Sequence, residues 1–182
     1  MKVAIIVGMP GSGKSEVLRI VKEKGIPVFN MGDVVTKIEP KKRGIEKVNE
    51  DVENEIRKEI RKKHGKEAIA VITAQEIEKM HADRVVIVGL HNFEELEYFR
   101  KRFEVHLIAI EVSKEKRKER TAKREERPLS SEDFENREKR YKEQFDIPEM
   151  MGEAEFRINN EGSVEDLKNE VGRMLAQLGL VV

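Results

Sequence analysis

An apolar segment that runs directly into a glycine-rich loop constrains this 182-residue chain more than any other feature. Residues 3–7, Val-Ala-Ile-Ile-Val, are all apolar and mostly β-branched, which predicts a strand buried on both faces. The next eight residues, GMPGSGKS, match the pattern G-x-x-x-x-G-K-[ST] of a phosphate-binding loop. A helical pattern follows, so the motif has the strand, loop and helix that it requires. A plain glycine-rich turn is the alternative, and this context argues against it.

Each residue type in the loop has a physical role. Glycines allow the backbone amides to turn inward around a phosphate, and the following helix directs the positive end of its dipole to the same place. Lys14 would reach the β- and γ-phosphates of a nucleoside triphosphate, and the Ser15 hydroxyl would ligate Mg²⁺. The residues expected to bind the nucleotide are Gly8, Met9, Pro10, Gly11, Ser12, Gly13, Lys14 and Ser15.

The composition narrows the class of protein. The chain has 36 basic and 36 acidic residues, so its total charge favours neither nucleic acid nor membrane as a partner. It has no cysteine, which excludes disulfides and thiolate metal sites. No segment approaches the length of a membrane span, and the first apolar run is too short for a signal peptide. We expect one cytoplasmic domain over residues 1–182, monomeric or weakly self-associating.

Strand and helix patterns alternate along the chain. Right-handed crossovers then favour a parallel sheet with helices on both faces. The predicted class is α/β, with a three-layer phosphate-loop NTPase fold, a five-stranded parallel sheet and a helical lid. Residues 39–43 contain Pro40 and precede Gly44, which predicts a loop there. Beyond the first strand, further strands are predicted at 27–31, 84–90, 104–112 and 155–158, and helices at 13–24, 49–64, 67–80, 93–103, 113–127, around 134–145 and after Ser163.

Asp33 follows the predicted second strand, at the edge of the sheet where the phosphate-binding loop also lies. Ligands of open parallel sheets bind beyond the carboxyl ends of the strands, so Asp33 is a candidate for the chemistry. It is equally a candidate for a helix N-cap, a common position for aspartate. One residue could serve in both ways.

Arg117, Arg120, Arg124 and Arg127 are spaced three, four and three residues apart, which places them on one helix face. Guanidinium groups can hold and stabilise a phosphoryl group during transfer, and a helical hairpin over residues 113–146 would exclude water as a lid. The interleaved acidic residues also fit a solvated, salt-bridged helix. A nucleic-acid patch is a third interpretation, weakened by those acids and by the lack of nearby stacking aromatics.

With these features in place, the chain resembles nucleoside-monophosphate-kinase-type P-loop proteins. In particular it is similar to a largely archaeal family related to dephospho-coenzyme A kinase and adenylate kinase. The resemblance covers essentially the whole chain. Its most specific parts are residues 8–15 (GMPGSGKS), residues 31–35 (MGDVV) and residues 159–163 (NNEGS).

The resemblance implies a role for each segment. Asp33 would lie near the acceptor hydroxyl, and residues 35–65 would form the helical acceptor side. Residues 113–146 would form the lid. Asn160 would approach the nucleotide base.

This chain also departs from the pattern of that family. Relatives read Asp-Gly-x-Arg-Ser at the end of the third strand, where this chain reads Val-Gly-Leu-His-Asn at 88–92. The missing acid would hold Mg²⁺ through water, and the missing arginine would grip the acceptor phosphate. Asp33 is expected to take over the metal role beside Ser15, with Glu111 as a further replacement. His91 would offer a pH-dependent phosphate contact near its ordinary pKa of about 6.5.

Two functions fit these features. The first is ATP-dependent phosphoryl transfer to a small acceptor, with Lys14, Asp33, Arg120 and Arg124 as catalytic residues and ATP with Mg²⁺ as cofactors. The second is a nucleotide-binding switch or slow NTPase that lacks acceptor kinase activity and binds a partner. The sequence leaves open the acceptor and the preference between adenine and guanine.

Overall fold

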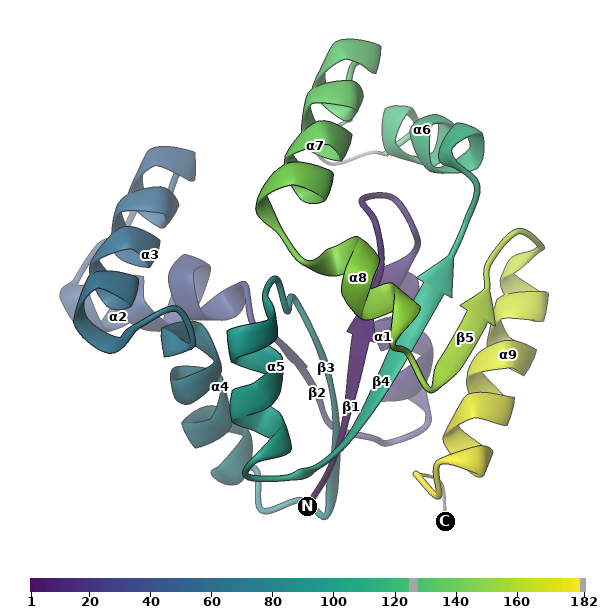
Figure 1. Ribbon diagram of the computed structural model, residues 1–182, viewed down its shortest axis with the longest axis horizontal. Coiled ribbons are helices and arrows are strands. Elements are labelled where there is room, and N and C mark those ends of the chain that lie inside the picture. The colour runs from purple at the N-terminus through teal and green to yellow at the C-terminus, as the bar shows by residue number, and fades with distance from the viewer. Residues whose placement is uncertain (125–127, 181–182) are drawn as a thin grey trace.

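Five parallel strands form one sheet, in the order β2-β3-β1-β4-β5 (Figure 1). The structure is a computed structural model that describes residues 1–124 and 128–180, and of Glu50 only the backbone. The order places β1 between β3 and β4, so the phosphate-binding loop leaves the middle of the sheet. The predicted α/β class and five-stranded parallel sheet are confirmed. The strands are β1 (Lys2–Val7), β2 (Val28–Asn30), β3 (Arg84–Val88), β4 (Glu104–Glu111) and β5 (Phe156–Asn159).

The central strand is buried because helices cover both faces of the sheet. Val3, Ile5 and Val7 face one core, and Ala4 and Ile6 face the other. Each of these residues is at most 1% exposed. Burying an aliphatic side chain of this size contributes about 1.5–3 kcal/mol, so β1 fixes the starting point of the loop firmly.

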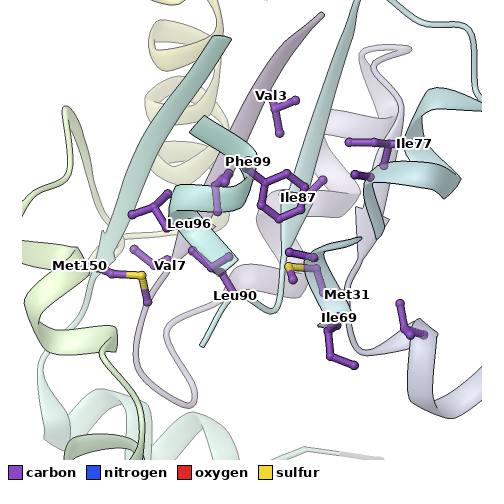
Figure 2. Close-up of a cluster of buried hydrophobic side chains, with 14 of the residues drawn as sticks. Val3, Val7, Met31, Ile69, Ile77, Ile87, Leu90, Leu96, Phe99 and Met150 are labelled. Carbon is purple, nitrogen blue, oxygen red and sulfur yellow. The ribbon is translucent and has the colours of Figure 1, made fainter. Parts of the chain in front are cut away.

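Two helices, α1 (Lys14–Glu23) and α9 (Val164–Gln177), pack on one face of the sheet. The other face is covered mainly by α4 (Ala68–Glu78), α5 (Phe93–Arg100) and α8 (Ile147–Gly152), with α3 (Glu50–His64) beside them. Figure 2 shows Leu96 and Phe99 of α5 and Met150 of α8 against strand residues of this core. In the described part of the chain, no helix is long and apolar enough to cross a membrane.

The loop predicted at 39–43 is wrong, because these residues form the short helix α2 (Glu39–Arg43). It continues a π-helical turn, η1 (Val34–Ile38). Pro40 lies in the first turn of α2, a position that proline tolerates because its fixed φ suits a helix. Helix α8 was missed as well, and it too has a proline, Pro148, in its first turn. Proline begins these helices instead of ending them.

Two helices, α6 (Lys114–Ala122) and α7 (Ser131–Gln144), follow β4 and lie beyond the carboxyl ends of the strands (Figure 1). The helix predicted over 113–127 is shorter than expected. Arg124 therefore lies past the end of α6, and Arg127 is outside the described residues. The prediction that these arginines share one helix face is thus wrong at Arg124: of the three that the structure describes, only Arg117 and Arg120 belong to α6.

Candidate functional site

The phosphate-binding loop requires glycine at two positions for reasons visible in its surroundings. Gly11 and Gly13 have φ of +82° and +97°, in the left-handed region that side chains disfavour. A Cβ on Gly11 would lie 2.8 Å from the carbonyl oxygen of Arg117, and one on Gly13 would overlap Nδ2 of Asn160. The loop is therefore enclosed by α6 on one side and by the β5–α9 connection on the other.

A Gly13→Ala variant is expected to bind ATP roughly 10-fold more weakly, because left-handed strain costs about 1–3 kcal/mol and the methyl group displaces Asn160. Isothermal titration with Mg·ATP measures this change. Gly25→Ala is the matched control. Gly25 also has a positive φ, of +75°, but among the described residues nothing beyond its own chain neighbours lies within 4 Å of its Cβ position. Equal losses of affinity in both variants would contradict the prediction.

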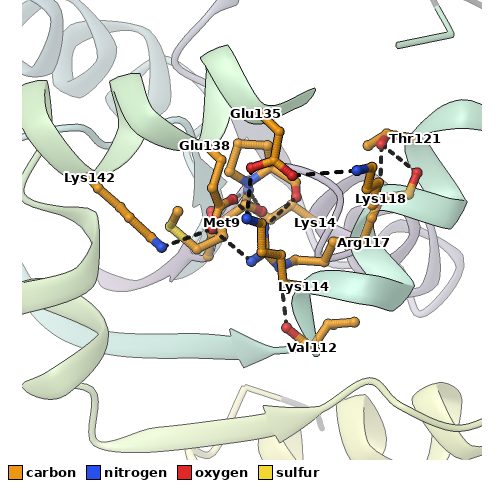
Figure 3. Close-up of polar contacts among 12 residues, drawn as sticks. Met9, Lys14, Val112, Lys114, Arg117, Lys118, Thr121, Glu135, Glu138 and Lys142 are labelled. Carbon is orange, nitrogen blue, oxygen red and sulfur yellow. Dashed lines mark hydrogen bonds and ion pairs between the residues drawn. The ribbon is translucent and has the colours of Figure 1, made fainter. Parts of the chain in front are cut away.

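The Lys14 amine lies inside the loop. It donates hydrogen bonds to the carbonyl oxygens of Gly8 and Met9, the latter at 3.1 Å (Figure 3). Burial, followed by the charges of Arg137, Arg124 and Arg117, lowers the pKa of Lys14 to about 7. The loop thus lies in a strongly positive environment that an anionic ligand would neutralise.

Arg117 connects the loop with both helices of the 113–146 segment. Its buried guanidinium pairs with Glu138 of α7 at 2.6 and 3.0 Å and donates to the Pro10 carbonyl at 3.2 Å (Figure 3). It also lies 5.8 Å from the centre of the Phe134 ring. Burial would raise the pKa of Glu138, but the hydrogen bond and charge of Arg117 lower it below its usual value. Arg117 therefore holds α6, α7 and the loop together.

Three other arginines of this region have no carboxylate partner among the residues that the structure describes. Arg120, Arg124 and Arg137 make no ion pair within the described residues, and Nη1 of Arg120 and Nε of Arg137 are buried without a hydrogen-bond partner there. Burial and then Arg137 lower the pKa of Arg124. Sequence reasoning did not identify Arg137 as a candidate site residue. Its spacing of three from Phe134 and four from Tyr141 was the available signal, because that spacing places it on the inner face of α7.

Asp33 precedes η1, and its side chain makes no N-cap hydrogen bond. One carboxylate oxygen lies 2.9 Å from the Lys37 amine, and the side chain is 30% exposed. The N-cap interpretation is therefore not realised. The role of Asp33 toward acceptor or metal stays a prediction, and the other replacement, Glu111, pairs with Arg157.

Asn160 is buried, and its side-chain amide donates to the Ser12 carbonyl at 2.8 Å. This bond braces the loop, whereas the contact with a nucleotide base stays a prediction. The Ser12 hydroxyl is buried without a hydrogen-bond partner in the described part of the chain. An unpartnered hydroxyl inside an amide-lined loop fits a phosphate oxygen.

A second polar cluster lies beyond the ends of β2 and β3. Arg57 and Arg61 of α3, His91 and Glu95 line a cavity of about 20 Å³ there. Gly32 after β2 and Gly89 after β3 also line it, together with the apolar residues Met31, Val35 and Ile69. Sequence reasoning singled out His91 but missed Arg57, Arg61 and Glu95. The two arginines were missed because α3 has the pattern of a charged helix exposed to solvent.

His91 cannot act as the expected pH-dependent contact. Its ring stacks on Phe145 at a centroid distance of 4.3 Å and meets the edge of Tyr141 at 6.0 Å. Burial, followed by the charges of Arg57, Arg61, Lys14 and Arg140, lowers its pKa to about 3. The imidazole is therefore neutral near pH 7, and titration near 6.5 is wrong.

Glu95 is the buried acid of this cluster and is 1% exposed. It accepts the backbone N–H of His91 at 3.0 Å and lies 3.5 Å from Nη2 of Arg61. Burial raises the pKa of Glu95 to about 7, against the lowering effect of these two contacts.

Comparison with known proteins places this chain in a family. The sequence matches the AAA domain family over residues 7–138. A UPF0200 protein of Methanocaldococcus jannaschii is 39% identical over 177 residues, which cover 95% of this chain and 88% of the relative. The chain belongs to the UPF0200 family. The predicted resemblance to an archaeal P-loop family is confirmed.

Solved structures share the fold of this UPF0200 chain. Shikimate kinase from Aquifex aeolicus matches with a TM-score of 0.57 and 20% identity, over 99% of both chains. Dephospho-CoA kinase from Campylobacter jejuni matches with a TM-score of 0.53 and 17% identity, over 97% of both chains. At such identities the likeness establishes a P-loop, kinase-like nucleotide-binding fold.

Proposed function

We propose that this UPF0200 protein is an ATP-dependent phosphotransferase acting on a small acceptor, as nucleotide and dephospho-CoA kinases do. The observation that carries the proposal is the group of arginines near the Lys14 amine. Arg124 and Arg137 act on Lys14 electrostatically, Arg120 lies one turn from Arg117, and none of the three has an ion pair within the described residues. Such a surplus of guanidinium groups suits a polyphosphate whose charge spreads during transfer.

Each part has a role in the proposed reaction. The loop amides and Lys14 hold the phosphates of ATP, and Asp33 orients the acceptor hydroxyl or accepts its proton after separating from Lys37. The acceptor oxygen bonds to the γ-phosphorus as the bond to the β–γ bridging oxygen breaks, and ADP leaves. Residues 113–146 cover the reacting groups as a lid, residues 35–65 form the acceptor side, and both belong to one domain over 1–182.

The available donors fit Mg²⁺, which prefers oxygen ligands and uses few of them from the protein when phosphates are present. Ser15 and Asp33 would hold the ion. When bound, Mg²⁺ neutralises charge on the transferring phosphoryl group. In the part of the chain that the structure describes, no group of three His, Asp or Glu side chains could hold a metal by itself.

One observation favours a nucleotide-binding switch as the second candidate. The end of β3 provides Val88, which is 5% exposed, where an acid would hold the metal. A switch would bind nucleotide tightly, hydrolyse it slowly and change its affinity for a partner protein with the nucleotide state.

An ADP-release assay tests the proposal. Purified protein with Mg·ATP is given nucleoside monophosphates, dephospho-CoA and shikimate in turn. One acceptor is expected to stimulate ADP release at least about 10-fold, because positioning of the acceptor and acid–base catalysis both accelerate the transfer. Lys14→Ala provides the background. If no acceptor gives product above that background while ATP still binds, the transferase proposal fails and the switch is favoured.

A further inference from the structure

We propose that a cavity of about 500 Å³ between α2, α3 and α4 is an effector site for a small amphipathic anion, a molecule with an apolar body and an acidic group. Cavities that bind small molecules measure about 300–1,000 Å³, so this one has a suitable size. No residue of the phosphate-binding loop is among the described residues that line it, and neither is Asp33. The site is therefore separate from the groups that would react in phosphoryl transfer. The three helices lie on the side of the molecule away from α9 (Figure 1).

The first support is that α4 is apolar on two opposite faces. Ala74 and Ile77 are fully buried in the core beside the sheet. Val71 and Ile72 lie on the opposite face, are half-buried, and line the cavity together with Ile60 of α3. A helix that is apolar all round is normally covered all round. The apolar body of a ligand would complete the cover of α4.

The second support is a positive charge without a partner on the wall of the cavity. Glu39 lies 2.9 Å from Lys42 and 3.5 Å from Arg43, and Arg43 also pairs with Glu59. These two acids and two bases, all of which line the cavity, balance one another. Lys63 lines it as well and makes no ion pair or hydrogen bond within the described residues. The acidic group of a ligand would neutralise this remaining charge.

The extent of the apolar lining favours a small molecule over a protein partner. Among the described residues, the apolar side chains that line the cavity are Ile60, Ala68, Val71 and Ile72, and the first two of these are already buried. A stable protein interface buries about 800 Å² on each partner, far more than the remaining two side chains can contribute. A second copy of the chain is therefore a less suitable occupant than a small ligand.

A ligand in this cavity would restrain the segment that follows Asp33. The π-helical turn η1 joins Asp33 to α2, and the backbone N–H of Glu39 donates to the Val34 carbonyl across the junction. Glu39 also lines the cavity, whereas α4, on the other wall, is anchored in the core. A ligand that contacts both walls should therefore oppose local opening of residues 34–43.

Fluorescence titration with anilinonaphthalene sulfonate tests the binding, because this dye joins an apolar body to a sulfonate. The loop is saturated with Mg·ADP so that the dye does not bind there. Gln75 is exposed and lines the cavity from α4, so the indole of Gln75→Trp would fill it. This variant is expected to bind the dye at least about 10-fold more weakly. Lys79→Trp, at an exposed position just after α4, is the matched control and should bind like the wild type.

The neutral dye phenylnaphthylamine, which is the same molecule without the sulfonate, tests the role of charge. Lys63→Gln should bind the sulfonate dye about 3-fold more weakly, the scale of an exposed ion pair, and the neutral dye as tightly as the wild type does. Lys62→Gln is the matched control, because Lys62 is exposed on the same helix but is not among the residues that line the cavity. It should affect neither dye.

Hydrogen exchange followed by mass spectrometry tests the restraint on η1 and α2. At a concentration of sulfonate dye about ten times its dissociation constant, amide exchange over residues 34–43 is expected to slow about 10-fold in the wild type. The same concentration should leave exchange in Gln75→Trp unchanged.

The proposal is overturned if the wild type and Gln75→Trp bind the sulfonate dye equally, or if neither binds it. It is also overturned if Lys63→Gln affects both dyes alike, or if the dye does not slow exchange over residues 34–43. A change of oligomeric state in Gln75→Trp, measured by light scattering, would assign the cavity to a contact between copies instead. None of these measurements involves turnover, so the failure of phosphoryl transfer and the failure of this site are distinguishable.

Discussion

Arg137→Gln is expected to slow phosphoryl transfer by about 10³-fold while changing ATP affinity far less, the scale of effect known for arginines that stabilise the transferring group. Arg137 is the largest single charge acting on Lys14, and its Nε is buried without a hydrogen-bond partner within the described residues. Its free hydrogen-bonding capacity suits the charge that develops in the transition state. Because it has no ion pair there, its removal leaves no buried acid behind and the fold should persist.

Single-turnover kinetics with Mg·ATP and the active acceptor measure the transfer rate, and isothermal titration measures ATP affinity. Lys139→Gln is the matched control, since Lys139 is an exposed residue on the same helix, two positions away. Arg137→Lys should recover part of the rate by keeping the charge without the planar fork. A transfer rate for Arg137→Gln within about threefold of the wild type would show that Arg137 has no part in the reaction.

The second large effect concerns stability. Arg117→Met is expected to lower the free energy of unfolding by about 3–5 kcal/mol, because it leaves the Glu138 carboxylate buried without its main partner. The Glu138 side chain is 4% exposed, and its other ion pair, with the exposed Lys142, is longer at 3.4 Å. Urea denaturation followed by circular dichroism measures the change.

The double variant Arg117→Met with Glu138→Leu should recover most of this loss, because the pair is then replaced by apolar side chains of similar volume. Lys118→Met, at an exposed ion pair one residue away, should change stability by less than about 0.5 kcal/mol. If the double variant is as unstable as the single one, packing and not the unpaired acid explains the effect.

The sheet could be predicted because each of its main strands is recognisable from a short run of consecutive residues. Residues 3–7 and 85–88 are continuous apolar runs, and a parallel sheet buries such runs on both faces. The misassigned helix α2 depended on a finer distinction. Pro40 is compatible both with a loop and with the first turn of a helix, and only the preceding π-helical turn, which sets the backbone direction, decides between them.

Only the part of the candidate site that is encoded by one continuous sequence motif could be predicted. The loop and Lys14 were located from eight consecutive residues, whereas the surroundings of His91 come from Tyr141 and Phe145, about fifty positions later. No local pattern shows that these rings will enclose the imidazole and keep it neutral. The same applies to Glu95, whose burial depends on α3.

The bond between Asn160 and Ser12 joins residues 148 positions apart. During synthesis the loop is therefore made long before the residue that braces it. A nascent chain that has not yet released β5 from the ribosome therefore lacks this support. Nascent chains should acquire full nucleotide affinity only once β5 and Asn160 have left the ribosome.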